Sequence, residues 1–183
     1  MPTILTHTAV PLALGIGLGS KKISRCLLVA GIAAAILPDF DVVGFRLHIA
    51  YGDLFGHRGF THSMLCAFCI ALIATTFART LHSGRLSTLC FVGICTLSHG
   101  LLDMLTNGGL GVALWSPFLN DRLFSAWRVI EVSPIGLRRI MSGRGVEVIY
   151  SELCWVWLPA SLICLCLIFC RRINKMMSEN IIR

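Results

Sequence analysis

The segment with the clearest chemical potential is Gly56–Ser63, with the sequence GHRGFTHS, which lies directly before an apolar run. It brings two imidazoles, a guanidinium and two hydroxyl groups to the start of that run. Titratable groups at a membrane boundary are costly to desolvate and usually serve a function. His57 and His62 are separated by a turn that contains Gly59, so their imidazoles can converge on one cation.

A further pair of ligand-type residues, His99 and Asp103, stands near the end of another apolar run. A spacing of four residues places both side chains on one helix face, a turn apart. They could bind one cation together, or the carboxylate could orient the imidazole. The alternative is a hydrogen-bonded polar pair that joins two helices in the membrane.

The carboxylates of Asp39 and Asp41 follow Pro38 at the end of a third run. The proline ends the helix and predicts an extended or turning segment. A divalent cation between the carboxylates would remove their mutual repulsion, whereas a solvated turn with an aspartate cap is the simpler alternative. Arg58 also has two interpretations: a bidentate grip on a phosphate or carboxylate oxygen, or an ion pair with Asp53.

The overall composition places these residues in a membrane protein. Of the 183 residues, 56% are hydrophobic and 14% charged, and the mean hydropathy is +0.80, which is too apolar for a soluble monomer. The net charge of +7 does not indicate nucleic-acid binding, because the basic residues form short clusters beside apolar runs. Membrane lipids are the expected partners. The nine cysteines are expected to be free thiols, since most lie in apolar runs.

The apolar pattern predicts an all-α, multi-pass transmembrane bundle of about four to five helices in a single integral-membrane domain, residues 1–183. Only helices or a closed barrel satisfy backbone groups in lipid, and no alternating pattern supports a barrel. Residues 106–152 are expected to form an extramembrane loop region. The apolar segments are Ala9–Gly19, Cys26–Leu37, Met64–Ala78, Leu86–Leu105 and Leu153–Cys170.

The distribution of lysine and arginine predicts the orientation of these segments. Basic clusters at 21–25, 79–85 and 171–175 favour the cytoplasmic side, although residues 106–152 also hold five arginines. With this threading, the ligand-type residues all lie at the opposite membrane face. His57, His62, His99 and Asp103 are predicted to contact a metal directly. The full set of candidate metal ligands is His7, Asp39, Asp41, His57, His62, His99 and Asp103.

These motifs resemble those of the YdjM family, and within it the YbcI branch. The resemblance extends from His7 into the last apolar run. It implies a bacterial inner-membrane location, a metal-dependent hydrolase site on the seven candidate ligands, and a distant likeness to the all-helical zinc phospholipases C and related nucleases. Val42 stands where some relatives carry a histidine. The elements that carry the resemblance are Gly56–Ser63, Pro38-Asp39-x-Asp41 and Leu97-Ser98-His99-x-x-x-Asp103.

The leading hypothesis is a membrane-bound, metal-dependent hydrolase that acts on a phosphoester or lipid-type substrate. A divalent metal, zinc in the first instance and otherwise manganese or magnesium, would activate water and polarise the scissile group. Asp39, Asp41 and Arg58 are the candidate catalytic residues, with a carboxylate as the proton acceptor. The alternatives are a transporter with the same residues as a transit site, and a non-catalytic scaffold whose metal joins helices.

Overall fold

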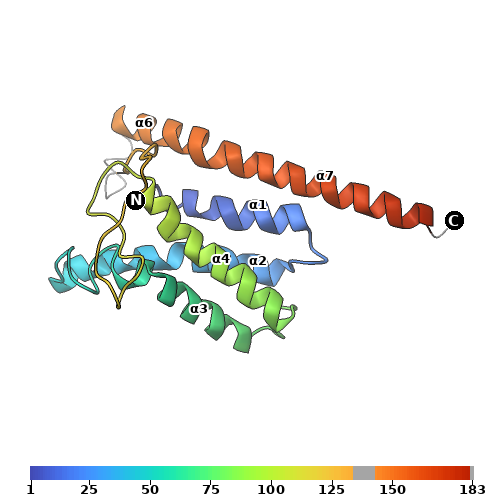
Figure 1. Ribbon diagram of the computed structural model, residues 1–183, viewed down its shortest axis with the longest axis horizontal. Coiled ribbons are helices and arrows are strands. Elements are labelled where there is room, and N and C mark those ends of the chain that lie inside the picture. Colours follow the sequence, from blue (N-terminus) through green and yellow to red (C-terminus); the bar gives the residue numbers. More distant parts are fainter. Residues whose placement is uncertain (134–142, 182–183) are drawn as a thin grey trace.

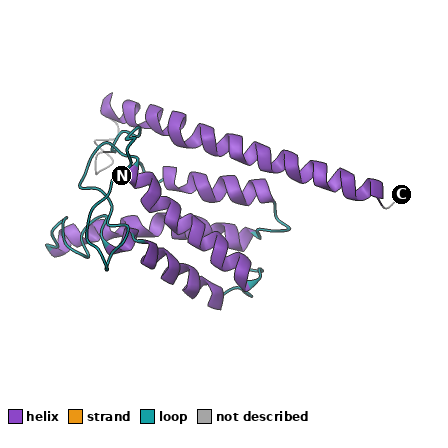
Figure 2. Cartoon of the chain, viewed as in Figure 1, coloured by secondary structure: helices purple, strands orange, loops and turns teal. Residues whose placement is uncertain are grey.

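Each of the five predicted apolar segments forms a helix in the computed structural model, which describes residues 1–133 and 143–181 (Figures 1 and 2). The described residues hold no β-structure beyond two isolated bridges, so the predicted all-α class is confirmed. The long helices are α1 (Ala9–Leu18), α2 (Arg25–Ile36), α3 (Met64–Thr76), α4 (Arg85–Met104), α6 (Gly143–Glu152) and α7 (Leu158–Ile181).

Three of the helical stretches are long and apolar enough to cross a membrane. They are Arg25–Leu47, Arg85–Met104 and Gly143–Glu179, and two shorter apolar helices, Thr6–Leu18 and Met64–Thr76, pack among them. Length and composition therefore confirm a multi-pass helical bundle. The last stretch is continuous because α6 leads through a π-helical turn, η4 (Leu153–Trp157), into α7.

The centre of the bundle is formed by α2, α3 and α4, while α1 packs against α7. Leu27, Ala35 and Val92 are fully or almost fully buried in this core. Gly31 allows α2 and α4 to approach closely, because a Cβ atom at this position would lie 2.3 Å from Cε1 of Phe91. Small residues serve this purpose in membrane bundles, where close backbone packing replaces the hydrophobic effect between helices.

The segment after Pro38 is helical, where the sequence predicted an extended or turning conformation. A 3-10 helix, η2 (Leu37–Leu47), continues from the end of α2. Proline is tolerated because it stands in the first turn of η2, where its missing N–H would have no partner. A 3-10 helix has three residues per turn, so Asp39 and Asp41, two positions apart, point in different directions. This explains why the two carboxylates do not converge on one point.

Local signals at the helix ends and the cysteines agree with the sequence. Ser63 caps α3, and its hydroxyl accepts a hydrogen bond from Cys66 N. All nine cysteines are free. Within the region 106–152, residues 106–133 form loops, residues 143–152 form α6, and residues 134–142 lie outside the described chain.

The two ends of the bundle differ in character (Figure 1). At one end lie the chain's N-terminus, η2, the loop that follows it, and the loop after α4. The turns between α1 and α2 and between α3 and α4 lie at the other end. The loop after α4 folds back across the first end, where Leu114 O accepts from Met64 N at 3.0 Å and Arg58 O accepts from Ala113 N at 3.0 Å. These bonds fix the segment that precedes α3.

Gly31→Val tests the close packing of α2 and α4. The added methyl groups would displace the buried Phe91 ring, and we expect the free energy of unfolding to fall by about 1–3 kcal/mol. Thermal unfolding in detergent measures the change. Gly52→Ala is the control, because nothing lies within 4 Å of a Cβ atom there. Equal stability of both variants would contradict the packing argument.

Candidate metal centre

Four ligand-type residues from three elements meet at the end of the bundle that carries the N-terminus. They come from η2, from the short 3-10 helix η3 (Phe60–His62), and from the last turns of α4. One ligand atom from each lies within 4.8 Å of the others. No side chain in the group is more than 3% exposed. The four residues are Asp39, His62, His99 and Asp103.

The two imidazoles of this group face each other in an unusual way. His99 Nδ1 lies 2.7 Å from the carbonyl oxygen of Ala35, which can only accept, so Nδ1 carries the proton. His62 Nδ1 lies 2.9 Å from Thr61 Oγ1, whose hydroxyl donates to Asp41 Oδ2, so this nitrogen is likewise a donor. The remaining nitrogens, Nε2 of His62 and Nε2 of His99, are only 3.0 Å apart. Two neutral rings would oppose their lone pairs here, and either a proton on one nitrogen or a bound cation relieves this contact.

The carboxylates next to these imidazoles have few protein donors. Neither oxygen of Asp39 has a hydrogen-bond partner, and Asp103 is paired with Arg58, whose Nε lies 2.9 Å from Asp103 Oδ2. Asp39 Oδ1 lies 3.3 Å from His99 Nε2, and Asp103 Oδ2 lies 3.4 Å from His62 Nε2. Buried carboxylates without donors are costly unless they are paired or coordinate a metal. The donor set of imidazole nitrogens and carboxylate oxygens fits a divalent cation.

His7 lies against the opposite side of the same group. It belongs to the short 3-10 helix η1 (Thr6–Thr8), directly before α1, and it is fully buried. Its ring stacks on His99 with the centroids 3.7 Å apart. His7 Nε2 lies 3.7 Å from both Asp39 Oδ2 and Asp103 Oδ1, and neither ring nitrogen has a hydrogen-bond partner. His7 can therefore accept a proton or complete the ligand set.

Asp41 lies behind the group of four residues and contacts several hydrogen-bond donors there. Its Oδ1 lies 2.6 Å from His57 Nδ1. Its Oδ2 accepts hydrogen bonds from the Thr61 hydroxyl at 2.7 Å and from Arg58 N at 3.1 Å. Both oxygens are thus occupied, and Asp41 holds His62 through Nδ1 while the opposite nitrogen points to the centre. This is the arrangement by which carboxylates orient metal-binding histidines.

His57, which the sequence predicted as a direct ligand, lies farther out than His62. It forms a separate group with Asp41 and His62, and its ring centroid is 5.7 Å from that of His62. The structure therefore brings all seven predicted residues to one end of the bundle, in an inner and an outer set. His48 and His82, the remaining histidines, are exposed and lie outside both sets.

The guanidinium of Arg58 is enclosed by protein atoms. Its Nε lies 2.9 Å from Asp103 Oδ2, and its two NH groups donate to Gly108 O at 2.9 Å and Thr106 Oγ1 at 3.0 Å. The ion pair with Asp53 that the sequence allowed is absent among the described residues, since Asp103 is the partner. Arg58 has a left-handed backbone with φ 62°, which a residue with a side chain adopts only when its surroundings impose it.

The formal charges of this centre do not cancel. Asp39, Asp41 and Asp103 contribute three negative charges and Arg58 one positive charge, which leaves two negative charges if all the imidazoles are neutral. Burial opposes protonation of His62, but the carboxylates of Asp103 and Asp41 outweigh it and raise its pKa to about 9. The group thus attracts positive charge, and a divalent metal would replace the proton and balance the remainder.

Some residues that hold the centre carried little or no signal in the sequence. Glu152 is buried at the start of the last span and accepts hydrogen bonds from the hydroxyls of Thr3 and Thr6, both at 2.7 Å, which fixes the segment before His7. Arg122 donates to His57 O at 3.0 Å and Tyr51 O at 2.9 Å. These contacts join residues far apart in the sequence, so the sequence could not predict them. A glutamate directly before an apolar run was nevertheless a usable signal.

Comparisons with known proteins give a family and a location. A family model described as YdjM inner membrane protein matches residues 1–177. The chain is 48% identical to the inner membrane protein YbcI of Escherichia coli (strain K12) over 164 residues, which cover 89% of this chain and 95% of the relative. It is 36% identical over 98 residues to the inner membrane proteins YdjM of Escherichia coli (strain K12) and Shigella flexneri, or 49% of this chain and 48% of each relative. No solved structure matches the chain.

Arg58→Met tests the role of the enclosed guanidinium. The substitution removes the cation that is paired with the buried Asp103 carboxylate. We therefore expect the metal-free protein to lose roughly 3–5 kcal/mol of stability. Chemical unfolding in detergent with a chelator present measures the loss. Arg46→Met removes an exposed arginine from η2 and should change stability by less than about 0.5 kcal/mol. A similar, small effect in both variants would show that Asp103 does not depend on Arg58.

Proposed function

The chain belongs to the YdjM family of inner membrane proteins, and we propose that it is a metal-dependent hydrolase with its active site at one end of the membrane bundle. The observation that carries this proposal is the pair of facing imidazole nitrogens, His62 Nε2 and His99 Nε2, 3.0 Å apart. The Asp39 carboxylate beside the pair has no hydrogen-bond donor, and the Asp103 carboxylate is paired with Arg58. Such a group is costly to bury without a cation.

We assign the metal to the inner set, with His62, His99 and Asp103 as its ligands and Asp39 beside the position left for water. Imidazole nitrogens together with carboxylate oxygens are the donors that zinc takes at catalytic sites. Manganese or magnesium would use the same carboxylates, but two imidazoles favour zinc. Arg58 and Asp41 act as positioning residues, because Arg58 holds Asp103 and Asp41 holds His62.

A bound divalent cation supplies Lewis-acid chemistry, by which water is activated and the scissile group polarised. The protein supplies the proton acceptor. Asp39 Oδ1 faces His99 Nε2, whereas Oδ2 lies 3.7 Å from His7 Nε2. Asp39 Oδ2 would accept the proton of the attacking water, and His7, with neither nitrogen hydrogen-bonded, lies beside it.

The surroundings of the centre favour a substrate with a lipid character. The same 3-10 helix that buries Asp39 presents Phe40, Val43 and Leu47 on its outer side, with exposed fractions of 59%, 51% and 67%. An apolar outer face is stable next to lipid and costly in water. A phosphoester or other ester with acyl chains would collect at this face, close to the metal ligands.

Removal of single ligands tests the metal assignment. His62→Ala and Asp103→Asn should each abolish bound metal, because each removes one of three protein ligands. The ratio of metal to protein in detergent-purified samples measures the loss. His48→Ala and His82→Ala are matched controls, since both histidines are exposed and outside the cluster. An unchanged metal ratio in His62→Ala or Asp103→Asn would refute the ligand set.

The positioning role of Asp41 gives a separate prediction. Asp41→Asn retains the three proposed ligands but weakens the contact that orients His62, and we expect the affinity for zinc to fall by about 10–100-fold. Competition with a fluorescent chelator measures the affinity. An affinity equal to that of the unmodified protein would show that Asp41 does not orient His62.

Turnover tests the hydrolase proposal itself. The unmodified protein, loaded with zinc in mixed micelles, should cleave a member of a panel of phosphoesters and phospholipids, lose activity with a chelator and regain it with zinc. Asp39→Asn should lower kcat by about 100-fold or more, as expected for a general base. Two outcomes would contradict the hydrolase proposal. Bound metal that stabilises the fold without any turnover would indicate a structural scaffold, and zinc flux into proteoliposomes would indicate a transporter.

A further inference from the structure

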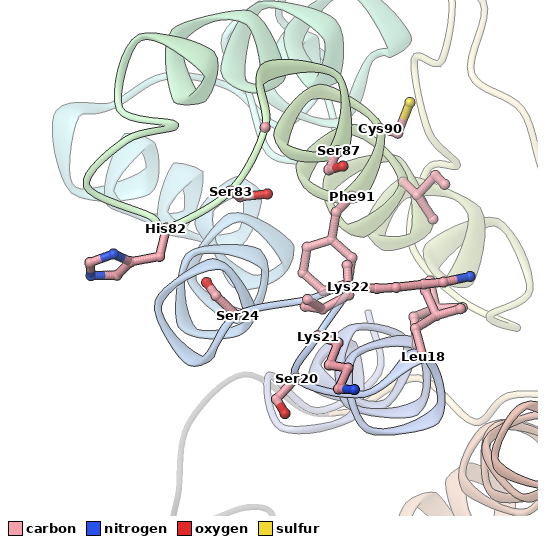
Figure 3. Close-up of a pocket in the computed structure, with 14 residues that line it drawn as sticks. Leu18, Ser20, Lys21, Lys22, Ser24, His82, Ser83, Ser87, Cys90 and Phe91 are labelled. Carbon is pink, nitrogen blue, oxygen red and sulfur yellow. The ribbon is translucent and has the colours of Figure 1, made fainter. Parts of the chain in front are cut away.

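A cavity of about 840 Å³ lies at the opposite end of the bundle from the metal centre, between the α1–α2 turn and the α3–α4 turn (Figure 3). Its mouth is polar and carries two ammonium groups. Figure 3 shows Lys22, Lys21 and Ser20 on one side of the cavity, with Ser83 on the facing turn and Ser87 at the start of α4, whereas His82 points away. The mouth therefore offers cations and hydroxyl donors.

The floor of the same cavity is apolar. Leu14 and Leu18 of α1 line one side, and Phe91 and Ile94 of α4 line the other. These residues belong to the apolar helices, while the lysines and serines belong to the turns and helix starts. The cavity thus changes from polar to apolar along the direction of the helices, as the membrane does from its surface to its interior.

No carboxylate balances the lysines at the mouth. Of the nine acidic residues in the chain, only Glu179 lies toward this end, and its carboxylate is 3.7 Å from Lys175 on the same helix. Among the described residues, neither Lys21 nor Lys22 has an acidic partner within ion-pair distance. The cavity is also lined by no acidic side chain. Its electrostatic complement must come from another molecule.

We propose that this cavity binds one anionic phospholipid, with the phosphate between Lys21 and Lys22 and the acyl chains along the floor. Basic pockets between transmembrane helices recognise lipid headgroups through such charges. The volume lies in the range of ligand pockets that enclose a headgroup and the first part of its chains. The apolar floor selects a lipid over free phosphate, because a soluble anion would leave Leu18, Phe91 and their neighbours in contact with water.

Lipid retention by the full-length protein tests this site. Detergent-purified protein is incubated with equimolar phosphatidylglycerol and phosphatidylethanolamine, and bound lipid is measured by native mass spectrometry. The protein should retain phosphatidylglycerol preferentially. Lys21→Gln/Lys22→Gln should weaken phosphatidylglycerol binding by about 30-fold, since each lysine contributes about a factor of five at a membrane surface.

Two further variants separate a built site from general surface charge. Arg79→Gln/Arg85→Gln removes the same charge from the same end, but neither arginine lines the cavity, so binding should change by less than about threefold. Ser87→Trp at an exposed position of the mouth should block binding without loss of charge.

Several results would overturn the proposal. These are an equal loss in both double variants, normal binding by Ser87→Trp, no preference for phosphatidylglycerol, or full displacement of the lipid by millimolar inorganic phosphate. Thermal unfolding of each variant identifies any that fail to fold. Because none of these residues contacts the metal centre, the outcome is independent of the hydrolase proposal.

Discussion

The candidate metal site depends on one constraint: the Nε2 atoms of His62 and His99 face each other at a distance of 3.0 Å. His99 Nδ1 donates to the Ala35 carbonyl, and His62 Nδ1 donates to the Thr61 hydroxyl, which itself donates to Asp41. Neither ring can turn its other nitrogen away without losing that bond, because both are buried. Two neutral rings would therefore oppose their lone pairs, beside an Asp39 carboxylate that has no hydrogen-bond donor. A proton on one ring or a bound cation removes this conflict.

The backbone around the two imidazoles is tightly packed and holds them in place. Arg58 adopts a left-handed conformation to reach Asp103. Gly56 and Gly59 flank the turn, where a Cβ atom would lie 2.2 Å from Ala50 O or 2.3 Å from Leu54 O. Gly100 allows the carbonyl of His62 to rest on α4, since a Cβ atom there would lie 2.7 Å from that oxygen. Strained and tightly packed backbone of this kind is tolerated where the site must be held in one geometry.

Charge is divided between the two ends of the molecule. The metal centre gathers buried carboxylates and imidazoles where the N-terminus and the long loops meet, and the opposite end carries lysines and arginines with almost no acidic residue. Between them the helices are apolar over their length. The division matches the asymmetry of a membrane, in which basic turns face anionic headgroups. The candidate metal site and the basic turns therefore lie at different ends of one bundle.

Local hydropathy predicted the membrane class and the helices, because both depend on neighbours within a few residues. The sequence also indicated which residues would gather at one end, since the spacing of the apolar runs alternates the chain between two faces. It could not place Asp41 behind His62, separate His57 from the inner set, or give Arg58 to Asp103. Those assignments join residues 16 to 45 positions apart. Only the packing of η2, η3 and α4 decides them, because directions of side chains across helices are set by tertiary contacts and not by local pattern.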